Sequence, residues 1–489
     1  MPTQESAWYE MIGQNTDADI RRFVQCESFA TALSPEEMSD VTIFCKIPIT
    51  KAAYTVLDGS DNAVLNGEHS FGPDGVATFA LKEAIPLEAL MPYTTAQGDY
   101  RIETSVTLAS GHEVGQHYTF RAILRTGKHT EQFPEGNLRE QLDAIPVANP
   151  SMTEAELRQI CLDYIRLETE FPFRFKEDFV YTIASQRRTR RLLGGKIYGG
   201  IPYVTRGAGN LYRIAEIYDP ATGVLDATSD IFDNIRLFGN ACSGSASMAW
   251  ARVVTSAYLG YTMFMTEANG FLPVGPYRYP KENVTKFIRD NPDEVCCRSL
   301  CDFNGEQTMY ESYALMKPAD GLVCNGHVRM NSAVPVVVRK PDGTVDPDES
   351  YTLLREQVCY TSHRNHLRIA SDGSHYVAQG RVDYHNTFRQ LFTEGYVPFT
   401  FAEFKDSSLV QPARIRLAVE PNLDERVLTA NYAISDVFAE RNGRRYSYRN
   451  KEFFRKELKL GDIFPAEALG PETKLSCRLY NGQLLEVVI

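Results

Sequence analysis

One cysteine of this chain stands where a protein can make a nucleophile from a thiol. Cys242 lies in GNACSGSASMAWARVV, where the turn formers Gly239 and Asn240 precede apolar residues that recur at helical spacing. Cys242 is therefore predicted at or near the first turn of a helix. The partial positive charge and unpaired N–H groups of a helix start favour the nucleophilic thiolate. The alternative is that Cys242 is a small buried hydrophobic residue, as most free cysteines are.

A candidate base follows in the segment MKPADGLVCNGHVRMNSAVPVVV. His327 begins a predicted strand in which apolar Val328 and Met330 alternate with polar Arg329 and Asn331. A cysteine nucleophile needs a base to take and return its proton, and that base needs a group that orients it. The sequence therefore predicts that His327 serves as the base for the cysteine.

The orienting group is expected on the next strand, SYTLLREQVCY. A turn at residues 341–343 folds this strand back, and pairing about that turn places residues 356–358 beside His327. Glu356 and Gln357 lie there, and either could hold the imidazole by its second nitrogen. Neighbouring residues of a strand face opposite sides, so only one of the two can face the histidine. Turn geometry alone does not decide which.

These residues, in this order, resemble a known family: the NlpC-type and CHAP cysteine peptidases and amidases, papain-like enzymes that act mostly on bacterial cell-wall peptides. The family pattern is Gly-x-Pro-Tyr, Asp-Cys-Ser-Gly at a helix start, Lys-Pro-Gly-Asp, and a strand that begins with His. Its counterparts here are GIPYV at 200–204, ACSG at 241–244, KPAD at 317–320 and HVRM at 327–330. The resemblance covers roughly residues 195–360, about a third of the chain.

The resemblance implies a role for each matched residue. Cys242 would be the nucleophile, His327 the general base, and Tyr203 a hydroxyl that contacts the oxyanion or the substrate. Glu356 matches the acid that CHAP enzymes carry two strands on, and Gln357 follows it. Chemistry of this kind requires no cofactor. The chain departs from the family pattern at Ala241, where the usual residue is Asp.

Around this centre the chain is predicted to fold as an α+β protein. A papain-like (NlpC-type) catalytic domain is flanked by two β-sandwich, Ig-like domains. Short β-branched or aromatic runs fill residues 1–130, and a polar linker with prolines spans residues 131–150. Mixed helix and strand signals then define the cysteine hydrolase domain at 151–405, and residues 406–489 return to strands.

The helix that begins the catalytic domain carries its own cap. Thr153 and Glu156 form a capping-box pattern, and Leu157, Ile160 and Tyr164 place one apolar stripe on the helix that follows. A new folding unit is therefore predicted to start near this point.

Composition limits the partners. With 51 Lys+Arg against 63 Asp+Glu, the formal net charge is −12, which does not attract a nucleic-acid backbone. The longest apolar runs, such as residues 333–338, are too short to span a membrane. Ten cysteines are too sparse for a disulfide-stapled module, and the CC-x3-C run at 296–301 lacks the paired knuckles of a zinc site. We therefore predict neither a metal nor a cofactor.

The predicted function is a cysteine peptidase or amidase that hydrolyses an amide bond in a peptide. Bacterial cell-wall stem peptide is the substrate that the resemblance implies. One alternative is a transglutaminase-like acyl transferase, and another is a catalytically inactive binding or scaffold protein. The first residues lack the order of a secretory signal, which predicts a cytoplasmic chain, whereas the resemblance implies the cell envelope or the exterior. The sequence does not predict an oligomeric state.

Overall fold

The computed structural model describes most of the chain. The described residues are 24–26, 42–58, 62–85, 89, 99–111, 113–114, 121–125, 136–183, 188–192, 194–195, 197–255, 271–279, 296–324, 326–357, 380–452 and 454–487. By its internal contacts the chain divides into two compact units. The first comprises 1–134, 172–198 and 359–379, and the second comprises 135–171, 199–358 and 380–489. Helices and several antiparallel sheets are both present, which confirms the predicted α+β class.

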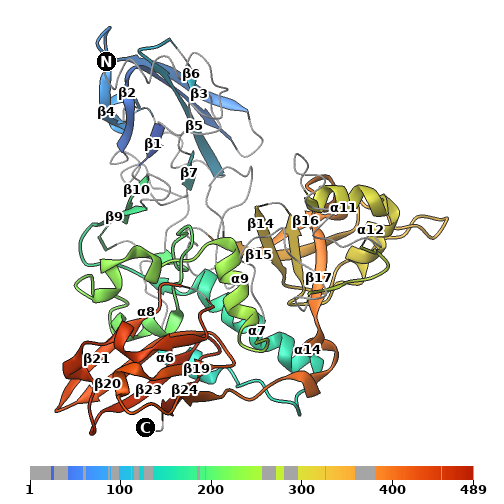
Figure 1. Ribbon diagram of the computed structural model, residues 1–489. Helices are drawn as coiled ribbons and strands as arrows, with labels where there is room; N and C mark the ends of the chain where they lie inside the picture. Colours follow the sequence, from blue (N-terminus) through green and yellow to red (C-terminus); the bar gives the residue numbers. More distant parts are fainter. Residues whose placement is uncertain are drawn as a thin grey trace, which may run out of the picture. The chain divides into compact units, whose positions relative to one another are not determined.

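The first unit is built on an antiparallel sheet of seven strands (Figure 1). Its elements are β1 (Val24–Cys26), β2 (Thr42–Leu57), β3 (Ala63–Ser70), β4 (Val76–Ala80), α4 (Leu81–Ala84), β5 (Asp99–Leu108), β6 (Glu113–Val114) and β7 (Arg121–Arg125). The long strand β2 pairs with β1, β3, β4 and β5 and therefore organises the sheet. Ile49, Val56 and Val106 are fully buried in its core. The Ig-like sandwich predicted for this region stays a prediction.

Three further strands belong to the first unit, and one more lies at its boundary. They are β8 (Pro172–Phe173), β9 (Phe179–Ile183), β10 (Arg188–Leu192) and β11 (Tyr198–Gly199). Strands β9 and β10 form an antiparallel pair. Phe175 stacks on Phe179 with ring centroids 4.4 Å apart, so aromatic packing fixes the chain that leads into β9.

The second unit is organised around a six-stranded sheet in which every neighbouring pair is antiparallel. In spatial order its strands are β12 (Phe271–Pro273), β17 (Val397–Phe401), β13 (Gly321–Cys324), β14 (His327–Asn331), β15 (Tyr351–Gln357) and β16 (Gly380–Thr387). The predicted turn after β14 is present, because Lys340 N–H donates to Thr344 O (2.8 Å) and Gly343 adopts a φ of 86°.

The helices described in the second unit are α6 (Leu138–Ala144), α7 (Glu154–Glu170), α8 (Leu211–Ile217), α9 (Cys242–Trp250), α11 (Cys296–Asn304), α12 (Glu306–Ala314), α13 (Phe388–Thr393), α14 (Ala402–Lys405) and α15 (Leu460–Ile463). Helices α7, α9 and α11 to α14 contact strands of the six-stranded sheet, whereas α6 contacts α8 and α15 contacts β22 (Figure 1). Helices α7 and α9 contact each other and β15, and α9 also contacts β14, whereas α11 and α12 contact β17. The segment predicted as a linker contains α6, whose Leu138 and Leu142 are buried.

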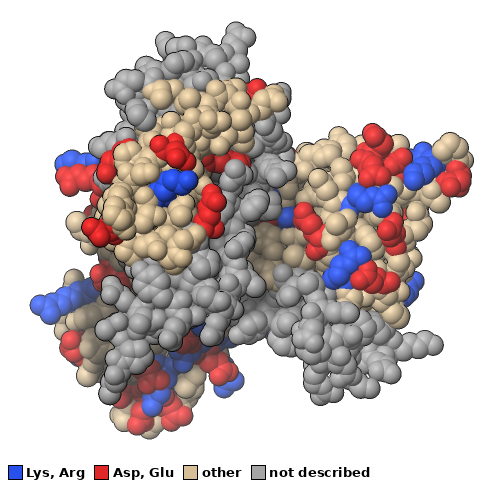
Figure 2. All heavy atoms as spheres, turned by 90° about the horizontal axis from the view of Figure 1, so that it is seen from above, with Lys and Arg blue, Asp and Glu red and all other residues tan. Residues whose placement is uncertain are grey.

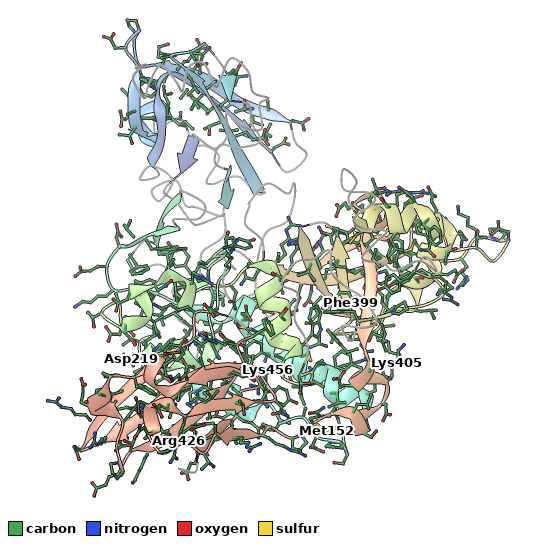
Figure 3. All side chains as sticks on the ribbon, viewed as in Figure 1. Met152, Asp219, Phe399, Lys405, Arg426 and Lys456 are labelled. Carbon is green, nitrogen blue, oxygen red and sulfur yellow. The ribbon has the colours of Figure 1, made fainter. Side chains whose placement is uncertain are left out.

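Trp250 at the end of α9 fixes this helix to the sheet. Its ring centroid lies 5.2 Å from that of Phe399 on β17, which is labelled in Figure 3, and its indole N–H donates to Ala319 O (2.8 Å). Ala319 belongs to the KPAD turn and has a φ of 68°. Glycine adopts such a φ without strain, whereas the Cβ of alanine makes it less favourable. The turn therefore has a left-handed backbone at a residue that is less suited to it than glycine.

The last part of the second unit consists of two antiparallel sheets. One contains β18 (Ile415–Leu417), β19 (Val427–Ala430) and β22 (Glu457–Lys459), and the other contains β21 (Arg444–Arg449), β20 (Ile434–Arg441), β23 (Lys474–Leu479) and β24 (Leu484–Val487). Both sheets contribute to one apolar core, with Leu428 from the first and Val437 and Leu475 from the second. The strands predicted in residues 406–489 are therefore present, and their assignment to an Ig-like domain stays a prediction.

A buried ion pair connects these C-terminal strands to helix α8. Arg213 and Asp436 are fully buried, and Arg213 Nε lies 2.7 Å from the Asp436 carboxylate. The same guanidinium donates to the backbone carbonyls of Ala208 (2.8 Å) and Ser435 (2.7 Å). The arginine thereby holds the loop before α8 against strand β20.

Charged side chains are mixed on the described surface that Figure 2 displays, with no broad area of one sign on that face. None of the helices within the described ranges is long and apolar enough to cross a membrane.

Candidate active site

The structure places Cys242 at the first residue of helix α9, as predicted. Ala241 precedes it in extended conformation, and its side chain provides no capping hydrogen bond to the helix. The backbone N–H groups of Ser243 and Val328 lie close enough to the Cys242 sulfur to stabilise its thiolate. The thiol is 6% exposed, so it is close to the surface but largely desolvated. The site therefore surrounds this sulfur with hydrogen-bond donors.

The turn before Cys242 is fixed by backbone pairing. Asn240 N–H donates to Pro202 O (3.0 Å), and Val204 N–H donates to Asn240 O (3.1 Å). Gly239 allows this approach, because a Cβ there would lie 2.4 Å from the Pro202 carbonyl oxygen. The GIPYV segment and the ACSG segment are thus neighbours in space, although far apart in sequence.

His327 is the first residue of β14, and its side chain reaches both Cys242 and Glu356. The imidazole lies close enough to the Cys242 sulfur to stabilise its thiolate, and its Nε2 lies 2.5 Å from Glu356 Oε2. Because Nε2 is occupied by the carboxylate, Nδ1 is the nitrogen that can serve the thiol. The structure therefore brings Cys242, His327 and Glu356 together in one series of contacts, with His327 in the middle.

Glu356 is held in its charged form by two arginines. Arg329 Nε donates to Glu356 Oε2 (2.8 Å), and Arg381 lies 3.0 Å from Oε1 in an ion pair that lacks hydrogen-bond alignment. Burial alone would raise the pKa of this carboxyl, but the charges of Arg329, His327 and Arg381 hold it far below its usual range. Glu394 also pairs with Arg329 (2.9 Å), so the cluster extends toward the surface.

A β-bulge explains why Arg381 faces Glu356. The register between β15 and β16 shifts between Leu354 and Glu356, so that Leu354 pairs with Tyr384 and Glu356 pairs with Arg381. Two residues of β16 therefore oppose one residue of β15, and one of them, Asp383, has a φ of 45°. Bulges of this kind change the direction of a side chain, and here the change completes the charged cluster.

The charges of this cluster favour a thiolate beside an imidazolium. Burial would raise the pKa of Cys242, but the charge and hydrogen bond of His327 and the two backbone N–H groups lower it below its usual value. Burial would lower the pKa of His327, but Glu356 and the Cys242 thiolate raise it to about 9. Both shifts favour the ion pair of thiolate and imidazolium over the neutral pair.

Two predicted residues lie elsewhere. Gln357 is buried, and its Nε2 donates to Ile201 O (3.0 Å). It follows Glu356 in the strand and contacts the GIPYV segment, not His327. Tyr203 is half-buried, and its backbone forms a parallel bridge with Asn240, beside the turn that precedes the cysteine. A role for its hydroxyl stays a prediction.

Arg329 and Arg381 were not anticipated as site residues. Arg329 could have been found, because it lies two residues after His327 and side chains at i and i+2 share one face of a strand. Arg381 gave no such signal, since residues 358–379 separate its strand from β15 and the bulge sets its register. Within the described residues, no cluster of His, Cys, Asp and Glu side chains has the arrangement of a metal site.

Comparisons with known proteins do not extend this description. No protein-family model, no curated protein and no solved structure matches the chain.

Replacing Glu356 by Gln is expected to lower the pKa of His327 from about 9 toward its usual value of about 6.5, because burial of the imidazole remains while one of its two counter-charges, the other being Cys242, is lost. Gln357→Glu and Gln357→Ala should leave the His327 titration near its original value. An NMR pH titration of labelled histidines measures the pKa of His327 in the Glu356 and Gln357 variants, and His327→Ala assigns the signal. A His327 pKa that stays high in Glu356→Gln would contradict this role for Glu356.

Proposed function

We propose that the chain is a cysteine hydrolase that cleaves an amide bond in a peptide. The observation that carries the proposal is the contact series of Cys242, His327 and Glu356, in which a buried carboxylate contacts the imidazole and the imidazole contacts a thiol at a helix start. Side chains in this relation form the minimal set for nucleophilic catalysis with a general base.

The geometry supports the following sequence of steps. The Cys242 thiolate attacks the carbonyl carbon, and backbone N–H groups at the start of α9 stabilise the oxyanion that forms. The imidazolium of His327 gives its proton to the leaving amine, which breaks the amide bond and leaves a thioester. His327 then takes a proton from water, whose oxygen attacks the thioester and releases the acid. Glu356 keeps the imidazole oriented and compensates its charge throughout.

The architecture is in keeping with the papain-like resemblance. A helix that begins with the cysteine packs against an antiparallel sheet whose strand β14 begins with the histidine. The resemblance extends the proposal to bacterial cell-wall stem peptide as the substrate class. The two alternatives differ from it in a defined way: an acyl transferase would pass the same thioester to an amine, and an inactive scaffold would form no thioester.

The experiment combines stem peptides of defined cross-links with the full chain, and mass spectrometry identifies the products. We expect hydrolysis by the wild type and a loss of about a thousandfold or more in Cys242→Ala. Cys324→Ser is the matched control, because Cys324 pairs with His327 across the strands yet has no assigned role. Capture of an added primary amine in place of water would assign acyl transfer. No turnover of any peptide, together with no adduct at Cys242, would favour the inactive scaffold.

A further inference from the structure

A second buried carboxyl lies beneath the turn that carries Cys242. Glu168, in the last turn of α7, is 0% exposed, and α7 packs against α9. Its Oε1 accepts a hydrogen bond from Asn240 Nδ2 (2.9 Å). The Ser245 hydroxyl on α9 lies close enough to stabilise the carboxylate, although without the alignment of a hydrogen bond. Glu168 therefore contacts residues on both sides of Cys242 in the sequence.

Asn240 connects the Glu168 carboxyl to the backbone around Cys242. Its side-chain Nδ2 also donates to Gly209 O (2.9 Å), while its backbone pairs with Pro202 and Val204. The carbonyl of Glu168 itself accepts a hydrogen bond from Ile201 N–H (3.0 Å). One residue of α7 thus holds both the turn that precedes the nucleophile and the segment that pairs with that turn.

Glu356 and Glu168, two buried carboxyls of the second unit, have opposite environments. Glu356 contacts two arginines, whereas the polar contacts of Glu168 in the described part of the chain come from the neutral groups of Asn240 and Ser245. Burial without a cation raises the pKa of Glu168 to about 7. Pairs of carboxyls whose environments separate their pKa values in this way commonly have different roles.

The unsatisfied oxygens around Glu168 point to a proton at this position. Glu168 Oε2, Asn240 Oδ1 and Ser245 Oγ are buried, and none of the three has a hydrogen-bond partner among the described residues. When the Glu168 carboxyl is ionised, its Oε2 can only accept hydrogen bonds, as Asn240 Oδ1 always does, so neither oxygen can satisfy the other. A protonated Glu168 carboxyl supplies one O–H donor to these three oxygens and removes a buried charge. Protonation therefore lowers both the free-energy cost of the unsatisfied oxygens and that of the buried charge.

Few other titratable groups surround Glu168. Tyr164, one turn earlier on α7, is neutral because burial raises its pKa well above its usual value. Arg252, beyond the end of α9, lies over the Tyr164 ring at 5.6 Å from its centroid, and Tyr212 on α8 lies under the same guanidinium at 5.8 Å. None of the three forms a hydrogen bond with the Glu168 carboxyl.

We propose that Glu168 is a positioning residue for Cys242 and that it acts in its protonated form, so that ionisation of this carboxyl loosens the nucleophile's turn and lowers its reactivity. The inference rests on the proposed function, since it concerns the same nucleophile. It adds a regulation that the cysteine, histidine and glutamate do not provide: the site would be most reactive in mildly acidic surroundings.

The test uses the full chain and two readouts, neither of which requires a substrate. The first is the infrared carbonyl band of a protonated carboxylic acid, which should be present at pH 6, weaken by pH 8 and be missing in Glu168→Gln. The second is the rate at which iodoacetamide modifies Cys242, followed by mass spectrometry. We expect the wild-type rate to fall about fivefold between pH 6 and pH 8 and the Glu168→Gln rate to stay constant.

Glu168→Gln keeps the donor and removes the titration, which makes it the informative variant. Asp163→Asn, on the same helix with its carboxylate bound to Gln159 (2.8 Å), is the matched control and should behave as wild type. If the rate of Cys242 labelling depends on pH identically in wild type and in Glu168→Gln, and is fast in both, this proposal would be overturned and the proposed function would remain intact. Slow labelling of Cys242 at pH 6 in both proteins would overturn both. A missing infrared band would overturn the role of Glu168 whatever the labelling rates.

Discussion

At pH 6, iodoacetamide is expected to modify Cys242 at least about tenfold faster than the other described cysteines. His327 lowers the pKa of this thiol below its usual value, so we expect Cys242 to have a larger thiolate fraction at pH 6 than ordinary thiols. Burial raises the pKa of both Cys301 and Cys477 to about 12, which leaves them unreactive. The expected difference in labelling rate between Cys242 and the other cysteines is limited, because a thiolate of low pKa is also a weaker nucleophile. Peptide mass spectrometry after short exposure measures each rate.

His327→Ala is the decisive control for this result. Loss of the imidazolium should return Cys242 to the behaviour of a buried thiol, so labelling at pH 6 should slow by at least about tenfold. The difference in Cys242 labelling rate between wild type and His327→Ala should become smaller toward pH 9.5, where the thiol of the variant also begins to ionise. Glu356 keeps both arginine partners in this variant, so the fold is expected to survive. Equal labelling of Cys242 with and without His327 would refute the ion pair.

Asp436→Asn is expected to destabilise the second unit by about 3 to 5 kcal/mol, because it leaves the fully buried Arg213 guanidinium without a counter-charge. Urea unfolding followed by the fluorescence of Trp250 measures the change, in a Trp8→Phe background that removes the other tryptophan. Labelling of Cys242 should slow as well, since Arg213 also holds the carbonyl of Ala208.

Asp230→Asn provides the comparison for this ion pair. Asp230 also binds an arginine, Arg449, at 3.1 Å, but its side chain is 53% exposed. Exposed pairs of this kind contribute at most about 1 kcal/mol. Similar losses of unfolding free energy in Asp436→Asn and Asp230→Asn would contradict our expectation, because they would show that burial does not increase the contribution of the Arg213–Asp436 pair to stability. Replacing Arg213 and Asp436 together by Leu should restore part of the lost stability, because neither charge is then left unpaired.

Local patterns were sufficient to predict the helix and the strand that begin with Cys242 and His327. The capping box of Thr153 and Glu156 is present, and α7 begins directly after Thr153. Helix α9 begins at Cys242 and strand β14 begins at His327, as their apolar periodicity indicated. Each of these features depends on residues within a few positions of one another, which is the distance over which sequence periodicity is informative.

The register between strands β14 and β15 could also be predicted from the sequence, to within one residue. Met330 pairs with Arg355, which differs by one position from the register expected from the turn at residues 341–343. That accuracy located Glu356 and Gln357 but could not choose between them, because a shift of one residue reverses the face of a strand. In the structure Glu356 contacts His327, and Gln357 contacts Ile201.

The charged cluster and the support beneath the nucleophile were beyond the reach of pattern reasoning. Arg381 faces Glu356 through a bulge in a strand that follows a long intervening segment. Glu168 looks like an ordinary glutamate of an amphipathic helix, and its burial follows only from the packing of α7 on α9. Both depend on tertiary contacts between distant segments, which neither residue type nor spacing encodes.

The Arg213–Asp436 pair has a consequence for the order in which this protein matures during synthesis. The ribosome makes Cys242 and His327 long before it makes Asp436, whose carboxylate is needed to satisfy the arginine that holds the Ala208 loop. That loop in turn contacts the turn before Cys242, since Gly209 N–H donates to Gly239 O (3.1 Å). A nascent chain that ends before β20 therefore carries the reactive residues without the means to hold them in place. We therefore expect Cys242 to become reactive only after the C-terminal strands have been made and Asp436 has paired with Arg213.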